Sequence, residues 1–143
     1  MICSFFGHGD SPDSLYGKLH EQIEYFIVER NITEFFVGTH GAFDRMVLKA
    51  LRELKEKHPH ITYYVVLAYM PTTENSIYRF SETLLPEGIE LVPKRFAISR
   101  RNRWMVQQSH IILCYITHQW GGAAQFVSYA RKQHKEIINL AEL

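Results

Sequence analysis

One local pattern occurs twice in this chain and limits the folds that it can adopt: a strand-like apolar run, a glycine-bearing polar turn, and then a helix. In the first copy, residues 34–37 are aromatic and β-branched, and residues 42–57 carry apolar side chains at helical spacing. In the second copy, the apolar run 111–116 leads through the turn 117–122 into a helical pattern. A strand followed directly by a helix is typical of parallel sheets with helical crossovers. The pattern therefore predicts an α/β fold.

The remaining segments continue the alternation of strand and helix. The apolar and aromatic run 61–68 is typical of a strand that is covered on both faces. Prolines and a glycine interrupt residues 69–95, so we expect an irregular connection there, with a short helical piece near 75–80 and an edge strand at 89–92. We expect further strands at 2–6 and 136–140 and further helices at 14–30, 95–105 and 121–134, with Ser11 or Asp13 and Ser99 as helix caps.

The expected architecture follows from this alternation. Strands joined by helices pack as a mostly parallel sheet of about five to six strands with helices on both faces. No internal repeat or linker divides the sequence. We therefore predict a single Rossmann-like three-layer domain over residues 1–143.

The two glycine-bearing turns are the candidate ligand site. The start of a helix leaves backbone N–H groups without intrahelical partners and carries partial positive charge, so it stabilises a phosphate or carboxylate. Gly38 and Gly41 allow the backbone of the first turn to approach such an anion, and Gly121 and Gly122 precede the small-residue helix start of the second. Both turns would open at the carboxyl edge of a parallel sheet and face one crevice. The alternative is that these glycines only make tight turns.

The composition is that of an ordinary globular protein. Hydrophobic residues make up 46% of the 143 residues and charged residues 22%, and the formal net charge of +1 disfavours a general nucleic-acid or membrane-surface role. Cys3 and Cys114 lie in apolar strand-like runs, where a reduced thiol behaves as a small buried hydrophobe. No run approaches the roughly 18 apolar residues of a membrane span, and the start lacks the pattern of a signal peptide. We therefore expect a cytoplasmic protein.

Four segments together resemble a known superfamily: residues 3–8, 38–46, 95–104 and 117–124. In this order they are similar to the SLOG superfamily, which unites the Lonely Guy cytokinin-activating enzymes, the DNA-processing protein A family and small YpsA-like bacterial proteins, with the greatest likeness to the last. The resemblance implies a Rossmann-like fold that binds a nucleotide or nucleoside phosphate, and a homodimer. It implies ligand contacts at the matching positions, which are Gly7, Gly38, Thr39, Gly41, Arg95, Thr117, Gly121 and Gly122.

The resemblance also bears on catalysis. In the Lonely Guy enzymes a glycine-rich motif is followed by a catalytic Glu, and Gln125 stands at the matching position here. An amide cannot give or take a proton as a carboxylate does. We therefore expect a binding module that senses or sequesters a nucleotide-derived ligand, with no further cofactor. The alternative is a hydrolase that cleaves the N-glycosidic bond of a nucleoside monophosphate, with catalytic groups among His8, His40, His118, Asp10 and Asp44.

Three of the eight histidines allow three interpretations. His8, His40 and His118 lie in the turns predicted to line the crevice, where an imidazole could bond a phosphate, transfer a proton near neutral pH, or simply fix the loop backbone. None of the eight histidines has the ligand spacing of a metal site, so no metal is expected.

A basic cluster precedes the last glycine-bearing turn, and guanidinium groups suit bidentate contacts with phosphate. Helical spacing places Arg100 and Arg103 on one face and Arg101 elsewhere, while Arg95 follows the proline-rich connection and is the favoured ligand contact. The alternatives are a solvated basic face and direct nucleic-acid binding, which the small net charge disfavours.

Aromatic residues at the ends of predicted strands could stack on a base at the crevice or belong to the core. The candidates for stacking are Phe43, Tyr69 and Trp120. Trp104 and Phe126 are instead expected in the core or in dimer contacts.

Overall fold

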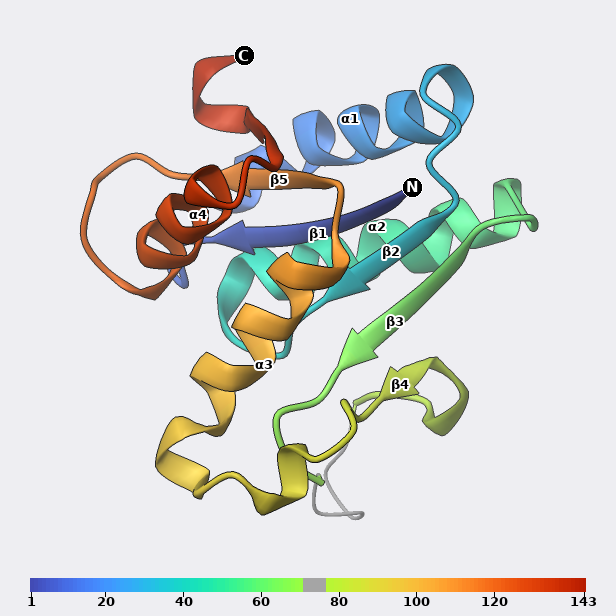
Figure 1. The fold of residues 1–143 in the computed structure, drawn as a ribbon. Helices are drawn as coiled ribbons and strands as arrows, with labels where there is room; N and C mark the ends of the chain where they lie inside the picture. The colour runs from blue at the N-terminus through green and yellow to red at the C-terminus, as the bar shows by residue number, and fades with distance from the viewer. Residues whose placement is uncertain (71–76) are drawn as a thin grey trace.

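A central sheet lies between two layers of helices in the computed structural model, which describes residues 1–70 and 77–143 (Figure 1). In this part of the chain six strands run parallel in the order β4-β3-β2-β1-β5-β6. The strands are β1 (Ile2–Gly7), β2 (Glu34–Val37), β3 (Thr62–Val66), β4 (Thr83–Leu84), β5 (Ile111–Tyr115) and β6 (Glu136–Asn139). The α-helices are α1 (Tyr16–Glu29), α2 (Gly41–Lys57), α3 (Lys94–Gln108) and α4 (Gly122–Lys132), and the 3-10 helices are η1 (Asp13–Leu15), η2 (Phe80–Glu82), η3 (Ile89–Leu91) and η4 (Leu140–Glu142).

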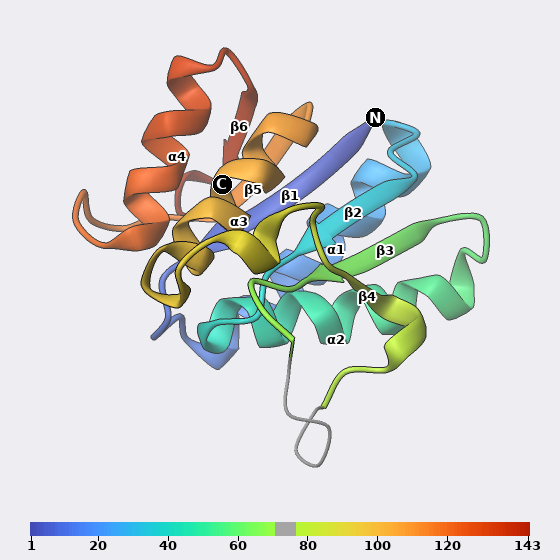
Figure 2. The same ribbon diagram turned by 60° about the horizontal axis from the view of Figure 1, so that its bottom comes forward.

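Each face of the sheet is covered by one pair of helices. Successive residues of a strand point to opposite faces, so Cys3 and Phe5 of β1 join the core under α1 and α2, and Phe6 joins the core under α3 and α4. The two helix layers can be followed in Figures 1 and 2. Burial on both faces explains why the central strands are continuously apolar in sequence.

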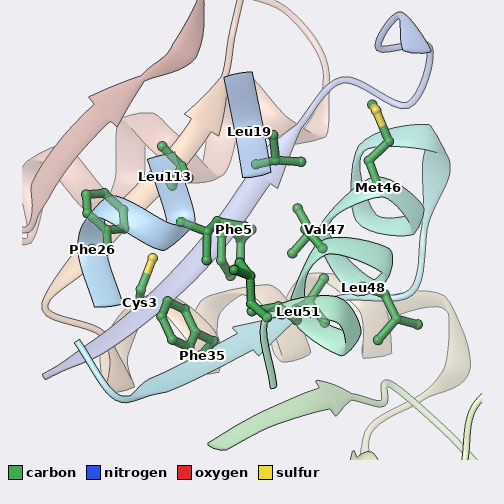
Figure 3. Packing of buried hydrophobic residues seen from close by; sticks show 14 of the residues in the cluster. Cys3, Phe5, Leu19, Phe26, Phe35, Met46, Val47, Leu48, Leu51 and Leu113 are labelled. Carbon is green, nitrogen blue, oxygen red and sulfur yellow. The ribbon is translucent and has the colours of Figure 1, made fainter. Parts of the chain in front are cut away.

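The larger core lies on the face covered by α1 and α2. Figure 3 shows Val47 and Leu51 of α2 packed toward Phe5 and Phe35 of the sheet. Phe5 and Phe35 also stack on each other, with ring centroids 6.1 Å apart. Apolar residues at helical spacing therefore fix α2 against β1 and β2, and the candidate site lies at the carboxyl ends of these two strands.

The predicted α/β class, with a Rossmann-like three-layer arrangement, is confirmed. The edge strand predicted at 89–92 is wrong. Ile89–Leu91 forms a 3-10 helix after Gly88, which has a left-handed φ of 82°. In the described residues the edge strand beside β3 is instead β4, which pairs with Val65 and Val66.

The predicted helix caps are also wrong. α3 begins directly after Pro93, because a proline suits a helix start, and Ser99 therefore lies inside the helix. Ser11 donates its hydroxyl to the His8 carbonyl, and no side chain caps η1 or α1. Of the helical piece predicted near 75–80, residues 75 and 76 lie outside the described residues, residues 77–79 are not helical, and Phe80 begins η2.

Candidate functional site

The strand order places a crevice at the carboxyl end of β1. The chain passes from β1 through α1 to β2 on one side, and β5 on the other side leads into α4 on the opposite face. Open α/β sheets bind ligands at such a point, where neighbouring connections part to opposite faces. A pocket of about 290 Å³ lies here. It is lined by Phe5, Phe6, Gly7, Gly9, Gly38, His40, Gly41, Asp44, Ile98, Arg101, Asn102, Met105, Gly122 and Ala123.

Two helix N-termini border this pocket. Gly41 begins α2 and Gly122 begins α4, and both residues line it. Neither helix has an N-cap side chain that accepts a hydrogen bond from its first turn. In the first turn of α2, the amide of Ala42 already donates to the Gly9 carbonyl at 2.9 Å. Because both helix starts line the same pocket, the positive ends of two helix dipoles act on one small volume.

Two glycines of the first turn are required by close contacts. Gly41 has a φ of 89°, and a Cβ there would lie 2.6 Å from the Cα of Gly9. A Cβ on Gly38 would lie 2.9 Å from a carboxylate oxygen of Asp44 and 3.4 Å from the guanidinium carbon of Arg101. Glycine at position 38 therefore allows a carboxyl and a guanidinium group to approach the backbone of the turn.

Arg101 is the buried cation of the pocket, with 1% of its surface exposed. One terminal nitrogen donates to the Val66 carbonyl at 2.8 Å and to the Thr39 hydroxyl at 3.0 Å, and Nε donates to the Asn102 side-chain oxygen at 2.7 Å. The other terminal nitrogen lies 3.4 Å from Nδ1 of His40. Burial lowers the pKa of Arg101 from its ordinary value, and the nearby Asp44 opposes that shift. The bonds to the turn after β2 hold this charge at the pocket wall.

Arg95 was the ligand contact predicted from the sequence, but in the structure Arg101 and not Arg95 lines the pocket. Arg95 is exposed, its guanidinium lies 4.8 Å from the centre of the Phe96 ring, and it does not line the pocket. A helical signal for Arg101 was present in the sequence: Ala97 and Met105, four residues to either side, are buried and share its face of α3.

Asp44 and His40 complete the polar wall. One oxygen of Asp44 accepts a hydrogen bond from the backbone N–H of His40 at 2.9 Å. Burial raises the pKa of Asp44 to about 6, although this hydrogen bond and Arg101 act in the opposite direction. Burial and the charge of Arg101 lower the pKa of His40. Near neutral pH the pocket therefore holds a permanent cation, a neutral imidazole and a carboxyl group close to its point of titration.

His8 and His118 lie beside the pocket and are not among the residues that line it. Nε2 of the buried His8 accepts a hydrogen bond from the backbone N–H of Thr117 at 3.0 Å. The His118 ring stacks on His8 and on Trp120, with centroid distances of 3.7 and 3.8 Å. Burial and the neighbouring His118 lower the pKa of His8. These two histidines fix the loops after β1 and β5 to each other, which was one of the three roles predicted for them from the sequence.

The other predicted ligand contacts take varied places. Gly7 lines the pocket, and a Cβ there would lie 2.2 Å from the Phe43 ring. Thr117 and Gly121 are exposed in the turn before α4 and do not line the pocket. Gln125, at the position matched to the Lonely Guy glutamate, is exposed on α4 and lines a separate surface hollow.

Among the aromatic candidates only Trp120 presents a largely free ring. Phe43 is fully buried in the core, so it cannot stack on a ligand. The ring of Tyr69 carries the Lys94 ammonium at 5.0 Å. Trp104 and Phe126 stack on Phe36 and Phe6 in the core, as expected.

The fold and the pocket define this chain as a Rossmann-like α/β protein with a polar crevice at its strand switch point. Comparison with protein-family models gave no match, and a search of curated proteins gave none either. Residues 1–70 and 77–143 contain no helix long and apolar enough to cross a membrane. In the same residues no three His, Cys, Asp or Glu side chains gather as metal ligands.

Proposed function

We propose that this chain binds a nucleotide or nucleotide-derived small molecule in the crevice after β1, β2 and β5, as a sensor or accessory module. The observation that carries the proposal is the convergence of two helix N-termini, at Gly41 and Gly122, on a pocket that also holds the buried guanidinium of Arg101. Each of these elements favours an anion, and together they surround one volume.

The size of the pocket supports a phosphate-bearing ligand that is only partly enclosed. About 290 Å³ is at the small end of the range of ligand pockets, so it accommodates a phosphate with part of a sugar. Burial raises the pKa of the Asp44 carboxyl to about 6, so this group is neutral and compatible with a nearby phosphate below that pH. A bound phosphate would be held by backbone amides and by Arg101.

Substitution at Gly122 tests this proposal without damaging the fold. A Cβ at Gly122 meets no atom within 4 Å, and an acidic residue in the first turn of a helix stabilises it. Gly122→Asp should therefore fold normally and repel an anion, while Gly122→Asn, of the same shape and uncharged, serves as the matched control. The measurement is thermal unfolding with a panel of nucleoside phosphates, nucleotide sugars and cyclic nucleotides, because a ligand of the native state raises Tm.

We expect at least one compound of the panel to raise the Tm of the native chain. Gly122→Asp should abolish most of that shift, and Gly122→Asn should retain it. A shift of equal size in Gly122→Asp would contradict an anion at the start of α4. Absence of any shift in the native chain would contradict the nucleotide proposal.

Chemical analysis of the stabilising ligand after the same experiment distinguishes a sensor from an enzyme. Asp44 favours the enzyme as a second candidate, because a carboxyl group with a pKa of about 6 beside a pocket can hold and release a proton near neutral pH. A stabilising nucleoside monophosphate recovered intact would support the binding module. Release of its free base, lost in Asp44→Asn while binding persists, would establish a hydrolase.

A third candidate, nucleic-acid binding, is favoured by the distribution of charge. Between Glu90 and Glu136 the sequence has no Asp or Glu and eight Lys and Arg residues. Two shallow hollows meet at Arg103, one along Arg100 and Phe96 and the other along Tyr129 and Lys132. A single-stranded polynucleotide would bind here with an affinity that falls steeply with salt.

A further inference from the structure

Three aromatic rings form a continuous stack beside the pocket. The rings of His8 and His118 are 3.7 Å apart and inclined by 14°, and those of His118 and Trp120 are 3.8 Å apart and inclined by 17°. At the inner end, Tyr115 meets the His8 ring edge-on, with centroids 6.5 Å apart. At the outer end, Trp120 is 71% exposed. The stack is therefore closed on one side and open on the other.

Hydrogen bonds hold two of these rings in place. The backbone N–H of Thr117 can only donate, so Nε2 of His8 is the acceptor and carries no proton. The carbonyl of Trp120 can only accept, so Nδ1 of His118, 3.0 Å away, carries the proton that it donates. The indole is thus supported by a fixed ring beneath it.

An exposed tryptophan of this kind is unusual, because its large apolar surface usually finds cover in the folded protein. Trp120 obtains cover on one face from His118 and leaves the remainder to solvent. Aromatic side chains that are rigid and half covered are suited to receive a planar ring, since every nucleobase presents a π face.

The stack adjoins the pocket through the backbone. His8 lies between Gly7 and Gly9, which both line the pocket, and Trp120 precedes the pocket residue Gly122 by two positions. Two residues span at most about 7 Å of chain. A ligand whose phosphate lies at Gly122 therefore has Trp120 within reach of its other end.

We propose that Trp120 is the base-stacking residue of this site: the ligand carries an aromatic base on its phosphorylated sugar, and the base completes the stack as its fourth ring. This rests on the proposed function, because it requires the phosphate to occupy the pocket. The pocket is too small to enclose the base as well, and the open face of Trp120 is the surface left to receive it. Purine nucleotides, with the larger ring, gain more from this contact than pyrimidine nucleotides.

The test compares two probes that differ only in the base, adenosine 5′-monophosphate and ribose 5-phosphate. Calorimetric titration of the full chain measures both affinities in the native protein and in Trp120→Ala, Trp120→Phe and Gln119→Ala. Gln119 is an exposed neighbour in the same loop and serves as the control. The melting temperature of each variant reports its folding.

In the native chain adenosine monophosphate should bind about ten- to hundred-fold more tightly than ribose 5-phosphate, which is the usual contribution of one base–aromatic stack. Trp120→Ala should remove that advantage and leave the affinity for ribose 5-phosphate unchanged. Trp120→Phe should keep most of the advantage, and Gln119→Ala all of it.

Two other results would contradict the stacking proposal, and they differ in whether the phosphate site remains. If both probes bind the native chain equally, or if Trp120→Ala retains the advantage of the base, the stacking proposal is overturned and the phosphate site stands. If neither probe binds at millimolar concentration, the phosphate site itself is contradicted and the stacking proposal falls with it.

Discussion

Among single residues, Asp44 lines the pocket and changes its charge near pH 6. Its carboxyl is neutral below its pKa of about 6 and negative above it. A bound anion would then face an additional negative charge at neutral and alkaline pH. The burial that raises this pKa arises because the carboxyl lies against Gly38 and the turn after β2.

We therefore predict that affinity for an anionic ligand falls as the pH rises from 5 to 7.5. The decrease should be roughly ten-fold, since a like charge a few ångströms away costs on the order of 1 kcal/mol or more in a partly solvated site. A cyclic nucleotide is the appropriate ligand, because the charge of its phosphodiester does not change in this range. Calorimetric titration at several pH values provides the measurement.

Asp44→Asn should remove most of this pH dependence, since the amide keeps an acceptor for the His40 N–H and cannot ionise. The remainder would come from His40, whose pKa is lowered and which gains its proton only on further acidification. Asp10→Asn, an exposed position in the neighbouring loop, should behave as the native chain. An unchanged slope in Asp44→Asn would assign the titration to another group.

The residues of the site differ in how far the sequence could predict them. The glycines of the two turns were predictable because a strand followed by a helix start is a local pattern. The role of Arg101 required the helical phase of α3, which the apolar residues Ala97 and Met105 indicate. The stack of His8 on His118 was not predictable, because the two rings lie 110 positions apart and meet only when β1 pairs with β5.

At the level of elements, a buried carboxylate fastens the edge of the sheet. Glu82 of η2 is buried and accepts hydrogen bonds from the side chain of Arg52 on α2, from the Tyr63 hydroxyl on β3 at 2.7 Å, and from the backbone N–H of Arg79 at 3.0 Å. Burial alone would raise the pKa of Glu82, but these donors outweigh it and hold the pKa below its ordinary value. Three elements are thereby connected through one side chain.

Glu82→Gln should destabilise the native state by about 1–3 kcal/mol at pH 7, because the amide keeps only one acceptor oxygen and loses the charge of the ion pair with Arg52. A depressed carboxyl pKa stabilises the fold above the pKa of the unfolded chain, and this contribution is lost as the pH falls through the folded-state value. The difference between variant and native chain should therefore shrink below about pH 4. Urea unfolding at pH 7 and pH 3.5 measures it.

Glu87→Gln, an exposed position in the same segment, is the control and should change stability by less than about 0.5 kcal/mol. A Glu82→Gln variant as stable as this control would show that β4 is held by its backbone pairing alone.

The same edge of the sheet contains the elements that could not be predicted from the sequence. The central strands follow from continuous apolar runs, which burial on both faces of the sheet requires, and α1 and α2 follow from apolar residues at helical spacing. β4 has only two residues and exists through its pairing with Val65 and Val66 and through the Glu82 contacts, which no local pattern records. The apolar residues Ile89 and Leu91 suggested a strand, yet the left-handed Gly88 and the following Pro93 favour a tight 3-10 turn.

For the whole molecule, the small net charge conceals a strong separation of charge. The eight basic residues of the carboxylate-free segment lie on α3 or in the stretch that ends α4 and precedes β6. All but Arg101 and Lys135 are exposed. α3 and α4 cover the same face of the sheet (Figure 2), so these basic side chains gather on one face, a separation that the net charge of +1 does not reveal. The net charge of +1 therefore does not disfavour binding of a polyanion to this particular face.

We predict that a single-stranded oligonucleotide binds this face weakly at low salt, with an affinity that falls linearly on a logarithmic plot against salt concentration. Each phosphate contact contributes about 0.7 to the steepness of the plot of log affinity against log salt concentration. The double variant Arg100→Gln with Arg103→Gln should therefore lower that steepness by about 1–1.5. Fluorescence anisotropy between 20 and 200 mM salt measures this affinity.

The control is the double variant Arg45→Gln with Lys49→Gln, which removes two exposed charges from α2, on the opposite face, and should leave the slope unchanged. Equal slopes in both double variants would mean that the basic face is merely solvated, whereas a loss confined to α3 would identify a second binding surface separate from the crevice.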